Sequence, residues 1–103
     1  MAWIKVAAEK DLADDRLVVD CDDVEIVIFR LEDGYYAIED ECSHAEASLS
    51  EGEIREGCKI SCPLHGAMFD IRTGKNLSFP AVMPVNAFPV KVEDGDIFID
   101  YEG

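Results

Sequence analysis

The only two histidines of the chain, His44 and His65, each follow a cysteine at close range. The first pair is Cys42-x-His44, in the motif CSH, and the second is Cys62-x-x-His65 followed by Gly66, in the motif CPLHG. Seventeen residues separate His44 from Cys62. Thiolates and imidazoles are metal ligands. Two cysteines and two histidines in paired loops could therefore surround a metal centre.

The spacing of these four residues leaves two other interpretations open. The first is that they are core histidines and buried thiols with no metal, although chance alone would seldom place both histidines in matched pairs. The second is a zinc-bound interaction module, because Cys₂His₂ is a common structural zinc set. Zinc ligand pairs usually have the spacings C-x₂₋₄-C and H-x₃₋₅-H, which the mixed pairs here fit poorly.

Two further cysteines, Cys21 and Cys58, lie outside both motifs. Disulfides are typical of secreted proteins, so we interpret all four cysteines as ligands or thiols. Cys21 stands in the acidic stretch DCDD and is expected to be a free thiol near a turn. Cys58 precedes the second motif and is expected to pack in a strand. If Cys58 replaced Cys62 as a ligand, the CPLHG pattern would be broken.

The composition of the chain limits its class and its partners. A chain of 103 residues fits one domain, and 49% hydrophobic with 31% charged residues indicates a globular protein. The net charge of -14 argues against nucleic acid or an anionic membrane, which require Lys and Arg. The acidic surface serves either solubility or steering towards a basic partner. No signal peptide or membrane-length apolar run is visible, so we expect a cytoplasmic protein.

The pattern of the chain predicts strand after strand. The expected strands, rich in β-branched and aromatic residues or alternating in polarity, are Trp3–Ala7, Arg16–Asp20, Val24–Leu31, Tyr35–Ile38, Cys58–Ser61, Met68–Ile71, Phe88–Val92 and Asp96–Tyr101. The turns Glu32-Asp33-Gly34 and Glu93-Asp94-Gly95 predict two hairpins. The only helix candidate is Glu9–Ala13. These elements predict an all-β antiparallel sandwich or barrel.

Two stretches are expected to be irregular, and the candidate ligands lie in or beside such loops. Residues 39–53 are polar and contain small side chains, and the acidic run Glu39-Asp40-Glu41 directly precedes Cys42. This run is either a solvated face or part of a docking surface. Residues 79–84 (FPAVMP) contain two prolines and cannot form a central strand.

C-x-H followed by C-x-x-H-G after some seventeen residues resembles the Rieske motif, in which two Cys bind one iron and two His bind the other. The resemblance extends over nearly the whole chain, including the strand AMFD, the turn TGK, the proline loop and the final hairpin. Within the family the chain looks most like the small ferredoxins of bacterial aromatic-ring-hydroxylating dioxygenases. It implies the Rieske fold as one domain over residues 1–103, with a smaller cluster-binding part at about 40–71.

The resemblance also implies the cofactor and the ligands. One [2Fe–2S] cluster per chain would be held by Cys42 and Cys62 on the buried iron and by His44 and His65 on the outer iron. The proline loop would cover the cluster. The chain would be no enzyme by itself, but a monomeric one-electron carrier in aromatic hydrocarbon catabolism. It would take electrons from a flavin-containing, NAD(P)H-dependent ferredoxin reductase and deliver them to a terminal oxygenase.

The chain departs from the Rieske proteins of respiratory and photosynthetic cytochrome complexes. Those proteins have a disulfide between the two loops, at positions that Ala47 and Leu64 occupy here. They also have Ser and Tyr hydroxyls near the cluster sulfurs, where this chain has Ala67 and Phe69. Fewer hydrogen bonds to the cluster predict a low reduction potential. An alternative within the family is the small Rieske-like subunit of an assimilatory nitrite reductase, whose members often lack some ligands.

Overall fold

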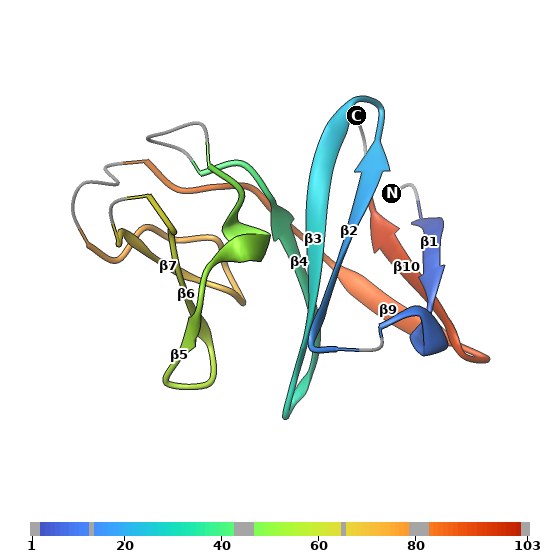
Figure 1. The fold of residues 1–103 in the computed structure, drawn as a ribbon. Coiled ribbons are helices and arrows are strands. Elements are labelled where there is room, and N and C mark those ends of the chain that lie inside the picture. The colour runs from blue at the N-terminus through green and yellow to red at the C-terminus, as the bar shows by residue number, and fades with distance from the viewer. Residues whose placement is uncertain (1–2, 13, 43–46, 65, 79–82, 102–103) are drawn as a thin grey trace.

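The computed structural model describes residues 3–12, 14–42, 47–64, 66–78 and 83–101 (Figure 1). Its strands are β1 (Trp3–Ala8), β2 (Arg16–Cys21), β3 (Val24–Leu31), β4 (Gly34–Glu39), β5 (Ile54–Arg55), β6 (Lys59–Ser61), β7 (Met68–Asp70), β8 (Ala87–Phe88), β9 (Val90–Glu93) and β10 (Asp96–Asp100). Two short 3₁₀ helices, η1 (Glu9–Asp11) and η2 (Leu49–Glu51), complete the described elements. The prediction of an all-β fold is confirmed.

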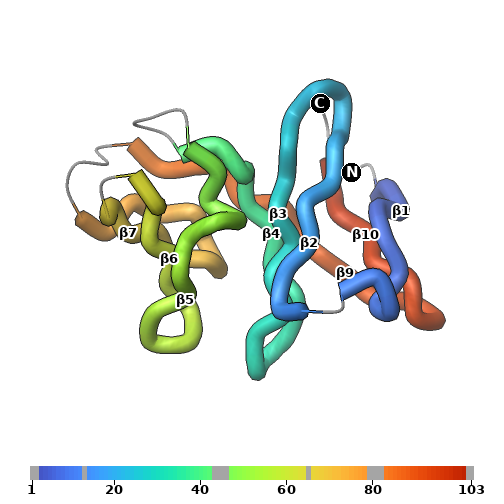
Figure 2. Tube along the Cα trace, in the orientation of Figure 1, coloured from blue at the N-terminus to red at the C-terminus, as the bar shows by residue number. Residues whose placement is uncertain are grey.

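The strands form three antiparallel sheets. Their orders are β1-β10-β9, β2-β3-β4-β8 and β5-β6-β7. Figure 1 shows the β2-β3-β4 region between the other two sheets, with β5–β7 on one side and β1, β9 and β10 on the other. The first and last strands, β1 and β10, pair with each other on that second side, as the tube in Figure 2 also shows. The β5–β7 sheet, against which Cys42 and Cys62 pack, therefore lies at the end of the molecule away from β1 and β10.

Strand β3 explains why the sheets are stacked in this order. Four successive residues of β3, from Ile26 to Phe29, are completely buried. Because side chains alternate across a strand, Ile26 and Ile28 enter one hydrophobic cluster, together with Ile97 and Ile99 of β10. Val27 and Phe29 enter a second cluster on the β5–β7 side. The middle sheet is thus buried on both faces, and its second face supports the candidate site.

Most expected strands are found within one or two residues, but the expected strand Phe88–Val92 is wrong as a single element. Phe88 of β8 pairs with Ala37 of β4, whereas Val90 of β9 pairs with Ile99 of β10. Pro89 separates the two pieces, because it has no N–H to donate to a ladder. The chain therefore crosses between two sheets at this proline. The two hairpins predicted at the Glu-Asp-Gly turns are confirmed as β3–β4 and β9–β10.

Three smaller differences concern the ends of elements. The helix expected at residues 9–13 is only the 3₁₀ turn η1, and Ala13 lies outside the described residues. Strand β5 was not expected. Cys58 lies in the turn between β5 and β6 instead of in a strand, and its amide donates to the carbonyl of Arg55 at 3.3 Å. Within the described part of the chain, no helix has the length and apolar character needed to span a membrane.

Candidate metal centre

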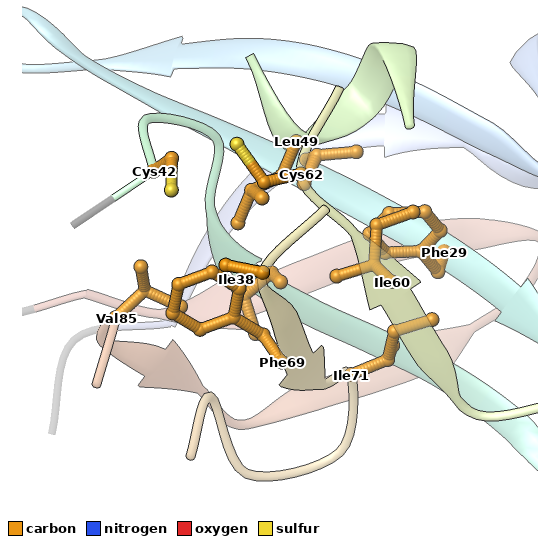
Figure 3. Close-up of a cluster of buried hydrophobic side chains, with 11 residues drawn as sticks. Phe29, Ile38, Cys42, Leu49, Ile60, Cys62, Phe69, Ile71 and Val85 are labelled. Carbon is orange, nitrogen blue, oxygen red and sulfur yellow. The ribbon is translucent and has the colours of Figure 1, made fainter. Parts of the chain in front are cut away.

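The structure brings Cys42 and Cys62 into the same buried cluster. Cys42 is 3% exposed and Cys62 1% exposed, and both pack in the hydrophobic cluster beneath β5–β7. Figure 3 shows the two side chains at the same end of this cluster, with Phe29, Ile60 and Ile71 at the other. The two histidines of the expected ligand set, His44 and His65, lie outside the described residues. The structure therefore describes the cysteine half of the expected set.

The two cysteines begin loops that close in the same way. The amide of Cys42 donates to the carbonyl oxygen of Ala47 at 2.9 Å, and the amide of Cys62 donates to that of Ala67 at 2.7 Å. In both loops the acceptor is five residues after the cysteine. The second loop is tightened further, because the Gly66 amide donates to the Cys62 carbonyl at 2.9 Å. Gly66 has φ 75°, a conformation that favours glycine, as expected for a tight turn.

The surroundings of the two thiols fit a metal centre that is anchored on its inner side. The cysteines are buried, whereas Pro63, Leu64 and Gly66 of the second loop are exposed. Thiolate is the form that binds metal, and a thiolate buried among apolar side chains requires a bound cation to offset its charge. A cluster held by these sulfurs would thus lie between a dry interior and the surface. The donor set and its burial fit a [2Fe–2S] centre.

Ala67 and Phe69 occupy the positions where the Rieske proteins of cytochrome complexes have Ser and Tyr hydroxyls. Ala67 and Phe69 are completely buried and belong to the same cluster as the cysteines. Neither side chain can donate a hydrogen bond. The proline loop is described only from Met83 onward, so the prediction that it covers the centre lies mainly outside the described residues. Val85, the residue directly after this loop, is buried in the cluster, and its amide donates to the carbonyl of Gly74 at 2.9 Å.

The sequence left open whether the acidic run before Cys42 is a solvated face or part of a docking surface, and in the structure its three residues differ in exposure. Asp40 is only 3% exposed, and its carboxylate accepts a hydrogen bond from the Ser50 amide at 2.7 Å. The Glu39 carboxylate accepts one from the Asn86 amide at 2.8 Å. Of the three, Glu41 alone is exposed, and with Glu25 it lines a cavity of about 230 Å³ beside Ala47 and Ser48. The carboxylates of Asp40 and Glu39 are therefore bound to backbone amides within the fold.

The two cysteines outside the motifs lie apart from this site. Cys21, at the end of β2, is a free thiol and packs in the other hydrophobic cluster with Ile26. Burial, reinforced by Asp22 and Asp20, raises the pKa of the Cys21 thiol above its ordinary value of 9.0. Cys58 is half-buried in its turn. The four cysteines, all among the described residues, form no disulfide.

Two buried cysteines in matched loops of an all-β fold fit a small iron–sulfur protein. A family model described as "Rieske [2Fe-2S] domain" matches residues 2–89, so the chain belongs to this family. The [2Fe–2S] cluster that characterises the family is its cofactor, and the zinc-bound module is not supported. The Rieske fold and the resemblance stated from the sequence are confirmed.

The chain is also similar to known ferredoxins, both in sequence and in structure. The chain is 49% identical over 75 residues to the ferredoxin subunit of 3-phenylpropionate/cinnamic acid dioxygenase from Shigella flexneri, covering 73% of this chain and 71% of the relative. It matches the ferredoxin of carbazole 1,9a-dioxygenase from Nocardioides aromaticivorans with a TM-score of 0.89 and 36% identity, over 99% and 100% of the chains. A complex of oxygenase and ferredoxin in carbazole 1,9a-dioxygenase also matches, with a TM-score of 0.84 and 36% identity, over 94% and 91%. The chain is thus similar to electron-transfer components of dioxygenase systems.

Proposed function

We propose that this chain is the one-electron carrier between a flavin-containing, NAD(P)H-dependent ferredoxin reductase and a terminal ring-hydroxylating oxygenase. The pair of buried cysteines in identically closed loops is the observation that carries the proposal. When bound, the cluster takes up and releases a single electron. The chain's own residues anchor it on one side and leave the other side close to the surface, where a partner can dock.

The ligand assignment is part of this proposal. Cys42 and Cys62 hold the inner iron through their thiolates, and His44 and His65 hold the outer iron. The burial of both thiols supports the first half of this assignment, and the CSH and CPLHG motifs support the second. The cluster-binding part covers about residues 40–71 of a single domain. We further propose that the carrier acts as a monomer in the cytoplasm.

The similarity to ferredoxin subunits favours a free carrier over the subunit of a nitrite reductase. The relative in the 3-phenylpropionate system is named as the ferredoxin subunit of a dioxygenase, and the carbazole protein is named as a ferredoxin. The complex of oxygenase and ferredoxin shows that one similar ferredoxin binds a terminal oxygenase directly. The oxygenase would select the aromatic substrate, because the carrier delivers only electrons.

A reoxidation experiment tests the proposal. The chain is reduced with dithionite, freed of reductant, and mixed anaerobically with the oxidised terminal oxygenase of the 3-phenylpropionate or the carbazole system. We expect the absorbance of the oxidised cluster to return at a rate that increases with oxygenase concentration. Reoxidation by neither oxygenase, together with co-purification of the chain with a large sirohaem subunit, would establish the nitrite reductase alternative instead.

A further inference from the structure

Residues 48–53, which we name the strap, follow the first cysteine loop and pack against the residue that precedes the second. The strap contains η2, and the side chain of Leu49 is completely buried in the cluster that holds Cys42 and Cys62. Figure 1 shows this 3₁₀ turn between the β2-β3-β4 sheet and β6. The strap is therefore placed where it can fix one loop relative to the other.

The first end of the strap is bonded to Asp40, two residues before Cys42. The carbonyl oxygen of Asp40 accepts a hydrogen bond from the Leu49 amide at 2.6 Å, and its carboxylate accepts one from the Ser50 amide at 2.7 Å. Asp40 is the only buried charged residue in the described part of the chain. A buried carboxylate costs free energy unless it is hydrogen-bonded, so these bonds hold the first turn of the strap firmly.

The second end of the strap is packed against Ser61, the residue before Cys62. A side-chain carbon added to Gly52 would collide with the carbonyl oxygen of Ser61. The Ser61 amide donates to the carbonyl of Glu53 at 3.0 Å. The strap thus contacts Asp40, two residues before Cys42, and Ser61, the residue directly before Cys62. At Gly52 the approach to the backbone leaves no room for a side chain.

Arg16, at the start of β2, holds the strap from outside. Its Nη1 donates to the carbonyl oxygens of Ser50 at 2.8 Å and Gly52 at 2.7 Å. Its Nε donates to the Asp15 carboxylate at 2.8 Å, and its guanidinium lies 5.2 Å from the centre of the Phe29 ring. The side chain is 21% exposed. These four contacts hold the guanidinium in one position. A planar guanidinium with several fixed N–H donors can make such contacts simultaneously, which an ammonium group does less well.

We propose that Arg16 is a positioning residue for the [2Fe–2S] cluster. It acts through the strap, because it satisfies two carbonyl groups at the end of η2 that the helix itself leaves open. Holding the strap in place fixes Ser61 relative to Asp40, and hence Cys62 relative to Cys42. The inference rests on the proposed function, because it takes Cys42 and Cys62 as cluster ligands.

The position of the strap also predicts the direction in which the reduction potential of the cluster would change. Glu51, Gly52 and Glu53 of the strap line a cavity of about 340 Å³ together with Cys62. If the strap moved outward, water would reach the Cys62 sulfur more easily. Solvent exposure is one of the factors that set the potential of an iron–sulfur centre. Reduction adds a negative charge, which water stabilises, and the two carboxylates would move away. Both changes raise the potential.

The test compares Arg16→Lys with Arg55→Lys in the cluster-loaded protein. Both changes keep the charge, and Arg55 lines the same cavity, but its guanidinium pairs with the exposed Glu53 carboxylate at 3.2 Å and holds no backbone group in the described structure. For Arg16→Lys we expect at least tenfold faster amide hydrogen exchange in residues 48–53. We also expect broader EPR lines from the reduced cluster and a potential above that of the unchanged protein. Arg55→Lys should match the unchanged protein in all three measurements.

Two results would overturn the proposal. Faster exchange and a lower unfolding temperature in Arg16→Lys, with the EPR spectrum and potential unmoved, would make Arg16 a structural residue only. Normal exchange of the strap in both Arg16→Lys and Arg16→Met would show that Arg16 does not hold it. If Arg16→Met fails to fold, the lysine variant decides. Cys62→Ser is measured alongside, because an unchanged spectrum there would refute the ligand assignment independently of Arg16.

Discussion

The amide of Cys62 points back across its own loop to the carbonyl oxygen of Ala67, at 2.7 Å. The same five-residue closure joins Cys42 to Ala47 at 2.9 Å. Each cysteine is thereby fixed at the base of its loop. In the second loop the exposed residues Pro63, Leu64 and Gly66 lie between the two partners. The second loop thus combines a buried, hydrogen-bonded base with a surface that a partner protein can reach.

The first prediction concerns the four proposed ligands. Replacing His44 or His65 with Ala removes a bond to the outer iron and should abolish the cluster or its Rieske EPR signal. The measured content of iron and sulfide should fall below the value of about two of each per chain that an intact cluster gives. Cys21→Ala is the matched control, because Cys21 packs in the other hydrophobic cluster. It should keep the full cluster and lose only ~1 kcal/mol of stability. An intact cluster in His65→Ala would refute the assignment.

The second prediction concerns the reduction potential. Ala67 and Phe69 are completely buried beside the cysteines, at the positions where cytochrome-complex Rieske proteins have hydroxyls. A hydroxyl donor to a cluster sulfur stabilises the reduced state by about 1–2 kcal/mol, which corresponds to roughly 45–90 mV for one electron. Ala67→Ser should therefore raise the potential, and Phe69→Tyr should raise it further.

Voltammetry of the unchanged protein, both single variants and the double variant at one pH measures this effect. The unchanged protein should lie near the lower end of the range of about −150 to +300 mV for Rieske centres. EPR must confirm an intact cluster in each protein. A potential well above zero in the unchanged protein, or four equal potentials, would show that these positions do not control the redox poise.

The third prediction concerns docking. Glu25 and Glu41 line a cavity beside Ala47, the residue that closes the first loop, so their carboxylates are in position to attract a basic oxygenase surface. Changing both to Lys should slow electron transfer to the oxygenase about tenfold at low salt, since steering contributes at least this much in charged pairs. The salt dependence of the rate should become weaker as well. Stopped-flow measurements over a range of ionic strength give both quantities.

Glu32→Lys provides the control for the docking prediction. Glu32 is exposed in the turn before β4, at the opposite end of that strand from Cys42. Six strand residues span roughly 20 Å, which is about twice the screening length of about 10 Å at 0.1 M salt. This change should therefore leave the rate almost unaltered. Equal effects of Glu32→Lys and Glu41→Lys would indicate that only the net charge matters.

The fourth prediction concerns stability at alkaline pH. The pKa of Cys21 is raised in the folded protein by burial and by Asp22 and Asp20. The stability that comes from keeping this thiol neutral is complete below the unfolded pKa of 9.0 and is lost as the pH rises towards the folded pKa. The free energy of unfolding should fall between pH 9 and 10 by at most about 1.4 kcal/mol per pH unit for one proton. Urea unfolding of the cluster-loaded protein measures it.

Cys21→Ala should flatten this alkaline dependence while leaving stability at pH 7 to 8 only slightly lower. The pH window is kept below the ordinary pKa of 10.0 for tyrosine, because the raised pKa values of Tyr35 and Tyr101 would add further losses of stability above it. An equally steep fall in Cys21→Ala would assign the effect to other groups.

Local sequence patterns were sufficient to predict most strands and the candidate ligands. Alternation of apolar and polar residues and turns such as Glu32-Asp33-Gly34 depend on neighbours only a few residues apart. The CSH and CPLHG motifs are local for the same reason. Pro89 was also visible in the sequence, and its missing N–H could have indicated that the expected strand at 88–92 would divide.

The surroundings of the candidate site depended on the tertiary structure. In the sequence Asp40 is one member of an acidic run that could be solvated. In the structure its carboxylate accepts a hydrogen bond from the amide of Ser50, ten residues later. The sequence gives Arg16 no role beyond that of a strand residue. Only the fold places the carbonyls of Ser50 and Gly52, which are 34 and 36 residues away in the chain, at its guanidinium. Residue type and spacing determined which side chains could bind a cluster. How tightly those side chains are held was decided by long-range backbone partners, because a hydrogen bond requires a position and direction that only the folded chain provides.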